Sequence, residues 1–90
     1  LKLSPENPAV LDTLGMVLLS QGEKDRAVEV LSKAASALPK SPEVRYHYAQ
    51  ALARARDRTR AIAELERLLV DHPKFPESAA AMALLTDLRK

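Results

Sequence analysis

Residues 8–42 read PAVLDTLGMVLLSQGEKDRAVEVLSKAASALPKSP, and no proline falls between Pro8 and Pro39. A proline inside a helix removes a backbone hydrogen bond and clashes with the preceding turn, so prolines collect at helix boundaries. Leucine and alanine dominate the apolar residues of this stretch, and both favour helix over strand. We therefore interpret residues 8–42 as a helical unit that is closed at both ends by proline.

The proline positions indicate that this unit is repeated. The six prolines lie in pairs at 5 and 8, 39 and 42, and 73 and 76, so that each pair follows the last by 34 positions. When residues 8–41 are shifted by this interval, eight positions are identical: Pro8/Pro42, Val10/Val44, Leu18/Leu52, Arg26/Arg60, Ala27/Ala61, Leu31/Leu65, Pro39/Pro73 and Lys40/Lys74. Self-similarity at such a period is typical of stacked helical repeats, in which the boundary and packing positions are fixed.

Each unit divides into two predicted helices. Apolar residues at i, i+3, i+4 and i+7 predict a helix at 9–21. Gly22 suits the left-handed end of that helix, and Asp25 is expected to cap the next helix or complement its dipole. The second helix runs into Pro39. The same plan predicts helices at about 43–55, from near Thr59 to the residues before Pro73, and at about 77–89.

A helix–turn–helix unit that recurs with this period resembles the tetratricopeptide repeat. The signature positions of that family are occupied in the first unit by Leu11, Leu14, Gly15, Leu18, Gly22, Ala27, Leu31, Ala34 and Pro39, and in the second by Arg45, Tyr48, Ala49, Leu52, Arg56, Ala61, Leu65, Leu68 and Pro73. The second unit departs from the pattern at Arg45, Arg56 and Leu68. The small residues at 15, 27, 49 and 61 would allow helices to approach closely.

The resemblance implies an all-α fold, a right-handed α-solenoid of antiparallel helix pairs. We expect residues 1–7 to be the remnant of a preceding repeat, 8–41 and 42–75 to be two full repeats, and 76–90 to be a C-terminal capping helix. The chain is thus interpreted as a segment of a longer array. A narrower resemblance, carried by LDTLG at 11–15 and PEVRYHY at 42–48, is to bacterial lipoproteins of exopolysaccharide and PEP-CTERM export systems. It would imply an exported or periplasmic location; otherwise the location is unknown, with the cytoplasm as the alternative.

In this family the first helix of each repeat lines a concave groove that binds peptides or partner helices. The predicted groove face consists of three stripes at helical spacing: Ala9, Asp12, Thr13, Met16, Leu19 and Ser20; Glu43, Tyr46, His47, Gln50, Ala53 and Arg54; and Glu77, Ala80, Ala81, Leu84, Asp87 and Leu88. The candidate binding residues are Asp12, Met16, Glu43, Tyr46, His47, Gln50 and Arg54. An aromatic ring, hydrogen-bonding groups and a cation suit a peptide backbone or an acidic side chain. The alternative is a merely solvated helix face.

One subset of the family grips C-terminal carboxylates with lysine and asparagine side chains in this groove. Here Asp12 and Met16 stand where a lysine and an asparagine would be expected, and His47 replaces a second asparagine. Glu77 and Ala81 replace the lysine and arginine that would complete the clamp. We therefore do not expect an acidic C-terminal tail as the ligand.

Other functional classes have little support in the sequence. There is no cysteine, and Glu43 with His47 supplies two metal ligands where a stable site needs three or four, so we expect an ion pair there and no metal, cofactor or catalytic site. Four arginines lie within residues 54–60, but the net charge is only +2 and no aromatic residue is interleaved to stack bases. Nucleic acid is therefore not expected as a partner. No apolar run approaches the ~18–20 residues needed to span a bilayer, so membrane contact is not expected either.

These observations favour a non-enzymatic protein–protein interaction module, part of a larger scaffold, that binds a peptide or partner helix in its groove. The alternative is a structural cap or self-association element without a specific groove ligand. Val10, Leu14, Val17 and Leu18 would be partly uncovered without a preceding repeat. An exposed apolar strip invites self-association, so a homo-oligomer through the N-terminal helix is a further expectation.

Overall fold

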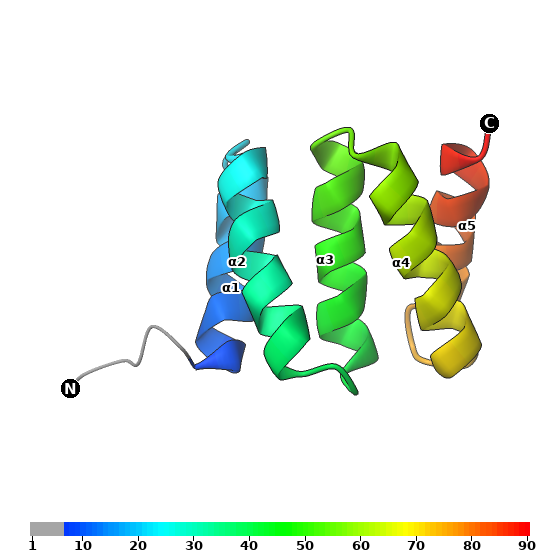
Figure 1. The fold of residues 1–90 in the computed structure, drawn as a ribbon, viewed down its shortest axis with the longest axis horizontal. Helices are drawn as coiled ribbons and strands as arrows, with labels where there is room; N and C mark the ends of the chain where they lie inside the picture. The colour runs from blue at the N-terminus through cyan, green and yellow to red at the C-terminus, as the bar shows by residue number, and fades with distance from the viewer. Residues whose placement is uncertain (1–6) are drawn as a thin grey trace.

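The computed structural model describes residues 7–90, which form five α-helices and no strand (Figure 1). The helices are α1 (Pro8–Ser20), α2 (Lys24–Ala37), α3 (Pro42–Arg54), α4 (Arg58–Asp71) and α5 (Ser78–Leu88). The all-α prediction is confirmed, and the predicted helix starts and ends lie within one or two residues of these bounds. Apart from Asn7, the predicted remnant at 1–7 lies outside the described residues.

The helices stack side by side in chain order along the long axis of the molecule (Figure 1). Each helix packs against the next, and α1 also contacts α3. Successive helices run antiparallel, so that α1, α3 and α5 all point the same way, with α2 and α4 in front of α1 and α5 in the view of Figure 1. The described residues extend over 44 × 26 × 17 Å. This is the antiparallel helical stack that the repeat pattern predicts, while its right-handed sense stays a prediction.

Two of the odd-numbered helices begin with the same capping arrangement. Asn7 Oδ1 accepts hydrogen bonds from the backbone N–H groups of Ala9 and Val10 at 2.9 and 3.4 Å. Ser41, at the equivalent position of the next unit, accepts from Val44 N at 3.4 Å. Each cap is followed by a proline at the first helical position, where the missing N–H costs nothing. The cap and the proline together fix where each unit begins.

The third boundary lacks such a cap. Phe75 takes the position that corresponds to Ser41 and is buried in the core. Helix α5 therefore begins at Ser78, after a turn in which Ser78 N donates to Phe75 O at 2.9 Å. An aromatic side chain at this position contributes packing instead of a cap.

The turns inside the two hairpins have the same backbone shape but different residues. Gly22 has φ +82°, as predicted for a left-handed helix end, and Arg56, its equivalent in the second hairpin, has φ +66°. Left-handed backbone is strained for a residue with a Cβ atom, so Arg56 holds a conformation that suits glycine. Of the two roles expected for Asp25, the cap is not observed, because Glu23 holds the cap position and α2 begins at Lys24. Asp25 lies in the first turn, where its charge complements the helix dipole as the other expectation had it.

The core contains two clusters of buried residues along the stack. One joins α1 to α4 around Leu31 and Leu52, and the other joins α3, α4 and α5 around Leu65 and Leu68. The four are fully buried. The predicted close approach of helices is present at Gly15, where a Cβ atom would lie 2.6 Å from Leu31 Cδ2 and closer still to its Cγ. That distance leaves no room for even a methyl group.

One face of α1 is uncovered, as expected. Leu14 and Val17 are 42% and 45% exposed, whereas their equivalents in α3, Tyr48 and Ala51, are 5% and 0% exposed. The difference arises because α2 packs against α3 while no described helix covers the corresponding face of α1. The same expectation is wrong for Leu18, which is buried in the cluster around Leu31.

Candidate peptide-binding groove

A cavity of about 280 Å³ opens between the odd-numbered helices. Its lining residues are Met16, Leu19 and Ser20 from α1, Tyr46, Gln50, Ala53 and Arg54 from α3, and Leu84 from α5. Most of these side chains are apolar or aromatic, and Ser20, Gln50 and Arg54 are polar. The cavity is small for a drug-sized ligand and has the dimensions of one or two side chains.

The repeat spacing explains why these residues meet. Met16, Gln50 and Leu84 are equivalent in the repeat and occupy the same position on three helices that point the same way. Side chains at equivalent positions of stacked repeats face the same side of the stack. All eight lining residues belong to the three stripes that the sequence predicts. The repeat spacing therefore accounts for the position of the cavity.

The candidate binding residues do not all meet at the cavity. Met16, Tyr46, Gln50 and Arg54 line it. Asp12, Glu43 and His47 lie nearer the N-terminal ends of α1 and α3 and do not line it. Two of the lining residues, Leu19 and Tyr46, are buried and form the floor of the cavity.

The structure corrects the expectation that Tyr46 offers a free aromatic surface. Tyr46 is only 8% exposed and packs edge-on against Phe75, with ring centroids 6.1 Å apart. The reason is that Phe75 turns into the core where the other two units have a helix cap. Burial, and secondly the Glu77 carboxylate, raise the pKa of the Tyr46 hydroxyl above its usual value of 10.0. Tyr46 thus lines the cavity from a buried position and offers little of its surface to a ligand.

The predicted pair between Glu43 and His47 is also wrong. His47 donates from Nδ1 to Asp12 Oδ1 at 2.8 Å, and Glu43 is exposed. This bond joins α3 to α1 across the groove face and is partly buried. Helical spacing placed all three residues on the groove face but gave no information on which partner in another helix lies nearer. Asp12 and His47 therefore bond to each other and connect α1 to α3.

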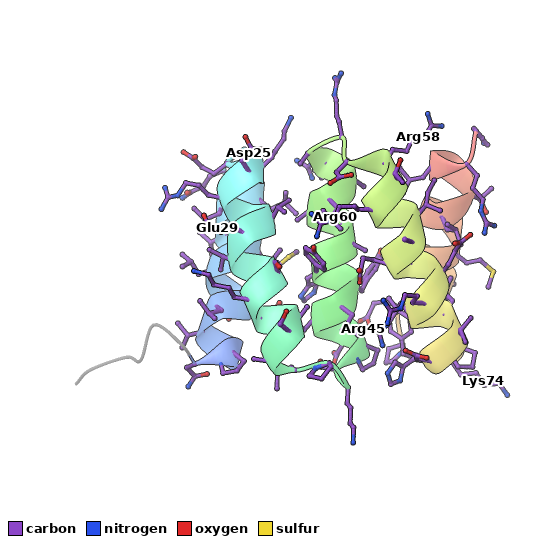
Figure 2. The ribbon with its side chains drawn as sticks, viewed as in Figure 1. Asp25, Glu29, Arg45, Arg58, Arg60 and Lys74 are labelled. Carbon is purple, nitrogen blue, oxygen red and sulfur yellow. The ribbon has the colours of Figure 1, made fainter. Side chains whose placement is uncertain are left out.

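The arginine-rich segment 54–60 does not act as a single charged surface. Arg60 donates to the Tyr48 hydroxyl at 2.6 Å, and Arg58 donates to the backbone oxygen of Leu88. Figure 2 shows Arg60 between α4 and α3, where Arg45, bonded to Asp71 at 2.9 Å, also lies. These contacts fasten neighbouring helices.

Arg54 differs from these arginines. It is exposed at the rim of the cavity, and no ion pair of residues 7–90 includes it. Its guanidinium is therefore available to an anionic group at the C-terminal end of α3. The sequence could not separate Arg54 from Arg58 and Arg60, because the partners of these two, Leu88 and Tyr48, lie on other helices.

Residues 7–90 contain neither a cluster of metal-ligating side chains nor a helix suited to span a membrane. No group of three or more His, Asp or Glu residues there is arranged to hold a metal ion. None of the five helices combines the length and the hydropathy that a membrane span requires.

Comparison with known proteins identifies the family. A family model described as the tetratricopeptide repeat matches residues 18–85, well over half of the chain. Searches of curated proteins and of solved structures found no match. The narrower resemblance to exported bacterial lipoproteins stays a prediction. The match spans the end of α1, all of α2, α3 and α4, and most of α5, which are the helices that form the cavity and its support. With its regular repeat spacing, its antiparallel helical stack and this match, the chain belongs to the tetratricopeptide repeat family.

Proposed function

We propose that this chain is a non-enzymatic protein–protein interaction module that holds a peptide or a partner helix in the groove of α1, α3 and α5. Tetratricopeptide repeats generally mediate protein–protein interaction and are typically not enzymes. The observation that carries the proposal is the cavity formed by equivalent positions of three parallel helices, with an apolar floor and a polar rim. A few polar groups around an apolar pocket are the usual composition of a binding site.

The proposal includes the division of the chain. Residues 8–41 and 42–75 are two repeats and 76–90 a capping helix, so that each of these three segments contributes one helix to the groove. The alternating arrangement leaves α2 and α4 to support the groove from behind. A ligand that crosses the groove would thus contact all three segments.

Gln50 offers a direct test because it lies in the middle of the cavity lining. Gln50→Trp would fill the cavity with an indole ring, and Lys33→Trp places the same residue at an exposed site on α2, outside the groove face, as a matched control. We expect a phage-displayed library of random dodecapeptides to yield peptides that bind the wild type and Lys33→Trp but fail to bind Gln50→Trp. Circular dichroism establishes that all three proteins are folded. Equal capture by Gln50→Trp would show that the peptides bind elsewhere.

A second function is favoured by the uncovered face of α1. Val10, Leu14 and Val17 line an apolar depression there, and two of them are more than two-fifths exposed. A surface of this kind supports the alternative of a self-association element. Sedimentation equilibrium should then give a molecular mass that rises with concentration for the wild type and stays monomeric for Leu14→Glu. A wild type that is monomeric at every concentration would exclude this function.

A further inference from the structure

The floor of the cavity suits one bulky apolar side chain. Leu19 and Tyr46 are buried and held by the core, and Met16 and Leu84 close the sides. An unbranched, flexible methionine can adapt to side chains of different shape. Filling this space with an apolar group removes apolar surface from water on both partners, which is the main source of affinity in a small pocket.

Gln50 adds a group that can hold a backbone. Its side-chain amide has both a donor and an acceptor, which match the C=O and N–H of an extended peptide. It lies between Met16 and Leu84 in the series of equivalent positions and is half-buried at the cavity. Gln50 is absent from the hydrogen bonds between side chains in the described residues. The Gln50 amide is therefore able to hydrogen-bond the backbone of an extended peptide.

The charge at the rim is positive. Of the described residues that line the cavity, Arg54 alone is charged. Arg54 follows Gln50 by one helical turn, about 6 Å along the helix axis at about 1.5 Å per residue. Residues two apart in an extended peptide lie about 6.6 Å apart and point to the same side. Of the two aspartates of the groove face, Asp12 is bonded to His47 and Asp87 pairs with Lys90 at 3.6 Å, and no ion pair of residues 7–90 joins either of them to Arg54.

From these three features we infer that the groove selects an extended peptide in which a bulky apolar residue lies within two positions of an aspartate or glutamate. The apolar side chain enters the cavity, Gln50 bonds the backbone, and Arg54 binds the carboxylate. This inference rests on the proposed function. It differs from recognition of a C-terminal carboxylate at the clamp positions, because Arg54 lies at the C-terminal end of α3, whereas Asp12 and His47 lie nearer the N-terminal ends of α1 and α3 and Glu77 precedes α5.

The test uses selection from the same dodecapeptide library against the whole chain and two charge-reversal variants. Arg54→Glu inverts the charge at the cavity. Arg67→Glu makes the same change at an exposed site on α4 that lines none of the cavity, and serves as the matched control. We expect wild type and Arg67→Glu to enrich peptides that pair an apolar residue with an acidic one. Arg54→Glu should enrich lysine or arginine in place of the acidic residue.

Affinity measurements then isolate the contact. For a selected peptide labelled with fluorescein, replacing its acidic residue by the matching amide should weaken binding to the wild type about tenfold in fluorescence anisotropy. The same replacement should have little effect on Arg54→Gln, which lacks the cation and adds no new charge. A double-mutant cycle of this kind measures the coupling between the two groups directly.

The outcomes separate the inference from the proposed function. If peptides bind and Gln50→Trp abolishes binding, but acidic residues are not enriched or Arg54→Glu selects the same peptides, the inference is wrong and the groove function stands. If no peptide is enriched, or if binding survives Gln50→Trp, both are wrong. Enrichment of acidic–apolar peptides that depends on both Gln50 and Arg54 supports both.

Discussion

Gly15→Ala is expected to destabilise the protein although alanine is the better helix former. In helix interiors alanine is favoured over glycine by about 0.5–1 kcal/mol. The added Cβ, however, would lie 2.6 Å from Leu31 Cδ2 and 3.1 Å from Cδ1. Leu31 is fully buried in the core cluster that joins α1 to α4, so that any shift of its side chain disturbs packed neighbours. Overpacking a filled core costs about 1–3 kcal/mol, and the contact with the branched end of Leu31 favours the upper part of that range.

The net change in unfolding free energy is therefore a loss of about 1–2 kcal/mol. In a domain of this size a loss of about 1 kcal/mol shifts the melting temperature by about 4–8 °C, so we expect Gly15→Ala to melt about 5–15 °C lower. Urea unfolding followed by circular dichroism in the far ultraviolet measures the free energy, and thermal melting measures the shift. An unchanged slope of the urea transition would show that the native fold is retained.

A second substitution tests the stated cause. Leu31→Met retains an apolar side chain of similar volume but removes the branch at Cγ, and such exchanges usually cost less than about 1.5 kcal/mol. The flexible methionine can move away from the new methyl group. Gly15→Ala should therefore cost less in the Leu31→Met background than in the wild type. If Gly15→Ala stabilises the wild type, or costs the same in both backgrounds, the contact with Leu31 is not the cause and the reasoning is refuted.

Three further predictions follow from other features. Arg56→Gly should stabilise the protein by about 1 kcal/mol in urea unfolding, because φ +66° is strained for arginine, and a loss of stability would contradict this. Because burial raises the pKa of Tyr46, the folded state retains its proton more tightly, so stability should be full below pH 10.0 and fall as pH rises above it; Tyr46→Phe should flatten this part of the melting profile. Asp12→Ala should cost about 0.5–1.5 kcal/mol and speed hydrogen exchange in α1, whereas Glu43→Ala should change neither, and equal effects would indicate that the bond from Asp12 to α3 is unimportant.

The helices could be predicted from the sequence because their signals are local. Proline excludes itself from helix interiors, and an apolar period of three to four residues marks the packed face of each helix. The glycine at position 22 likewise predicts the left-handed backbone that the structure has there. The cap at Asn7 carried a comparable local signal, an asparagine directly before a proline, which the repeat comparison with Ser41 would have strengthened.

The details of the site depended on contacts between distant residues. The period of a helix places Asp12, Glu43 and His47 on one face, but it does not give the distance between side chains of different helices. Likewise the burial of Tyr46 depends on Phe75, which is distant in sequence and belongs to a turn. A helical period defines a stripe of candidates, and the packing of neighbouring helices then decides which members of that stripe stay available to a ligand.

A comparison of the two units indicates where the specific chemistry of this chain lies. Several positions that pack inside the stack are the same in both, as in Leu31 and Leu65 or Ala27 and Ala61, all of them fully buried. Positions that face the cavity differ, and Met16 corresponds to Gln50. Packing imposes the same requirement on every unit of a stack, because each must present the same surface to its neighbour. A ligand that crosses the stack meets each unit with a different part of itself, so the groove positions are free to diverge. The differences between units, and above all the amide of Gln50 and the cation of Arg54, are therefore the features from which a partner should be sought.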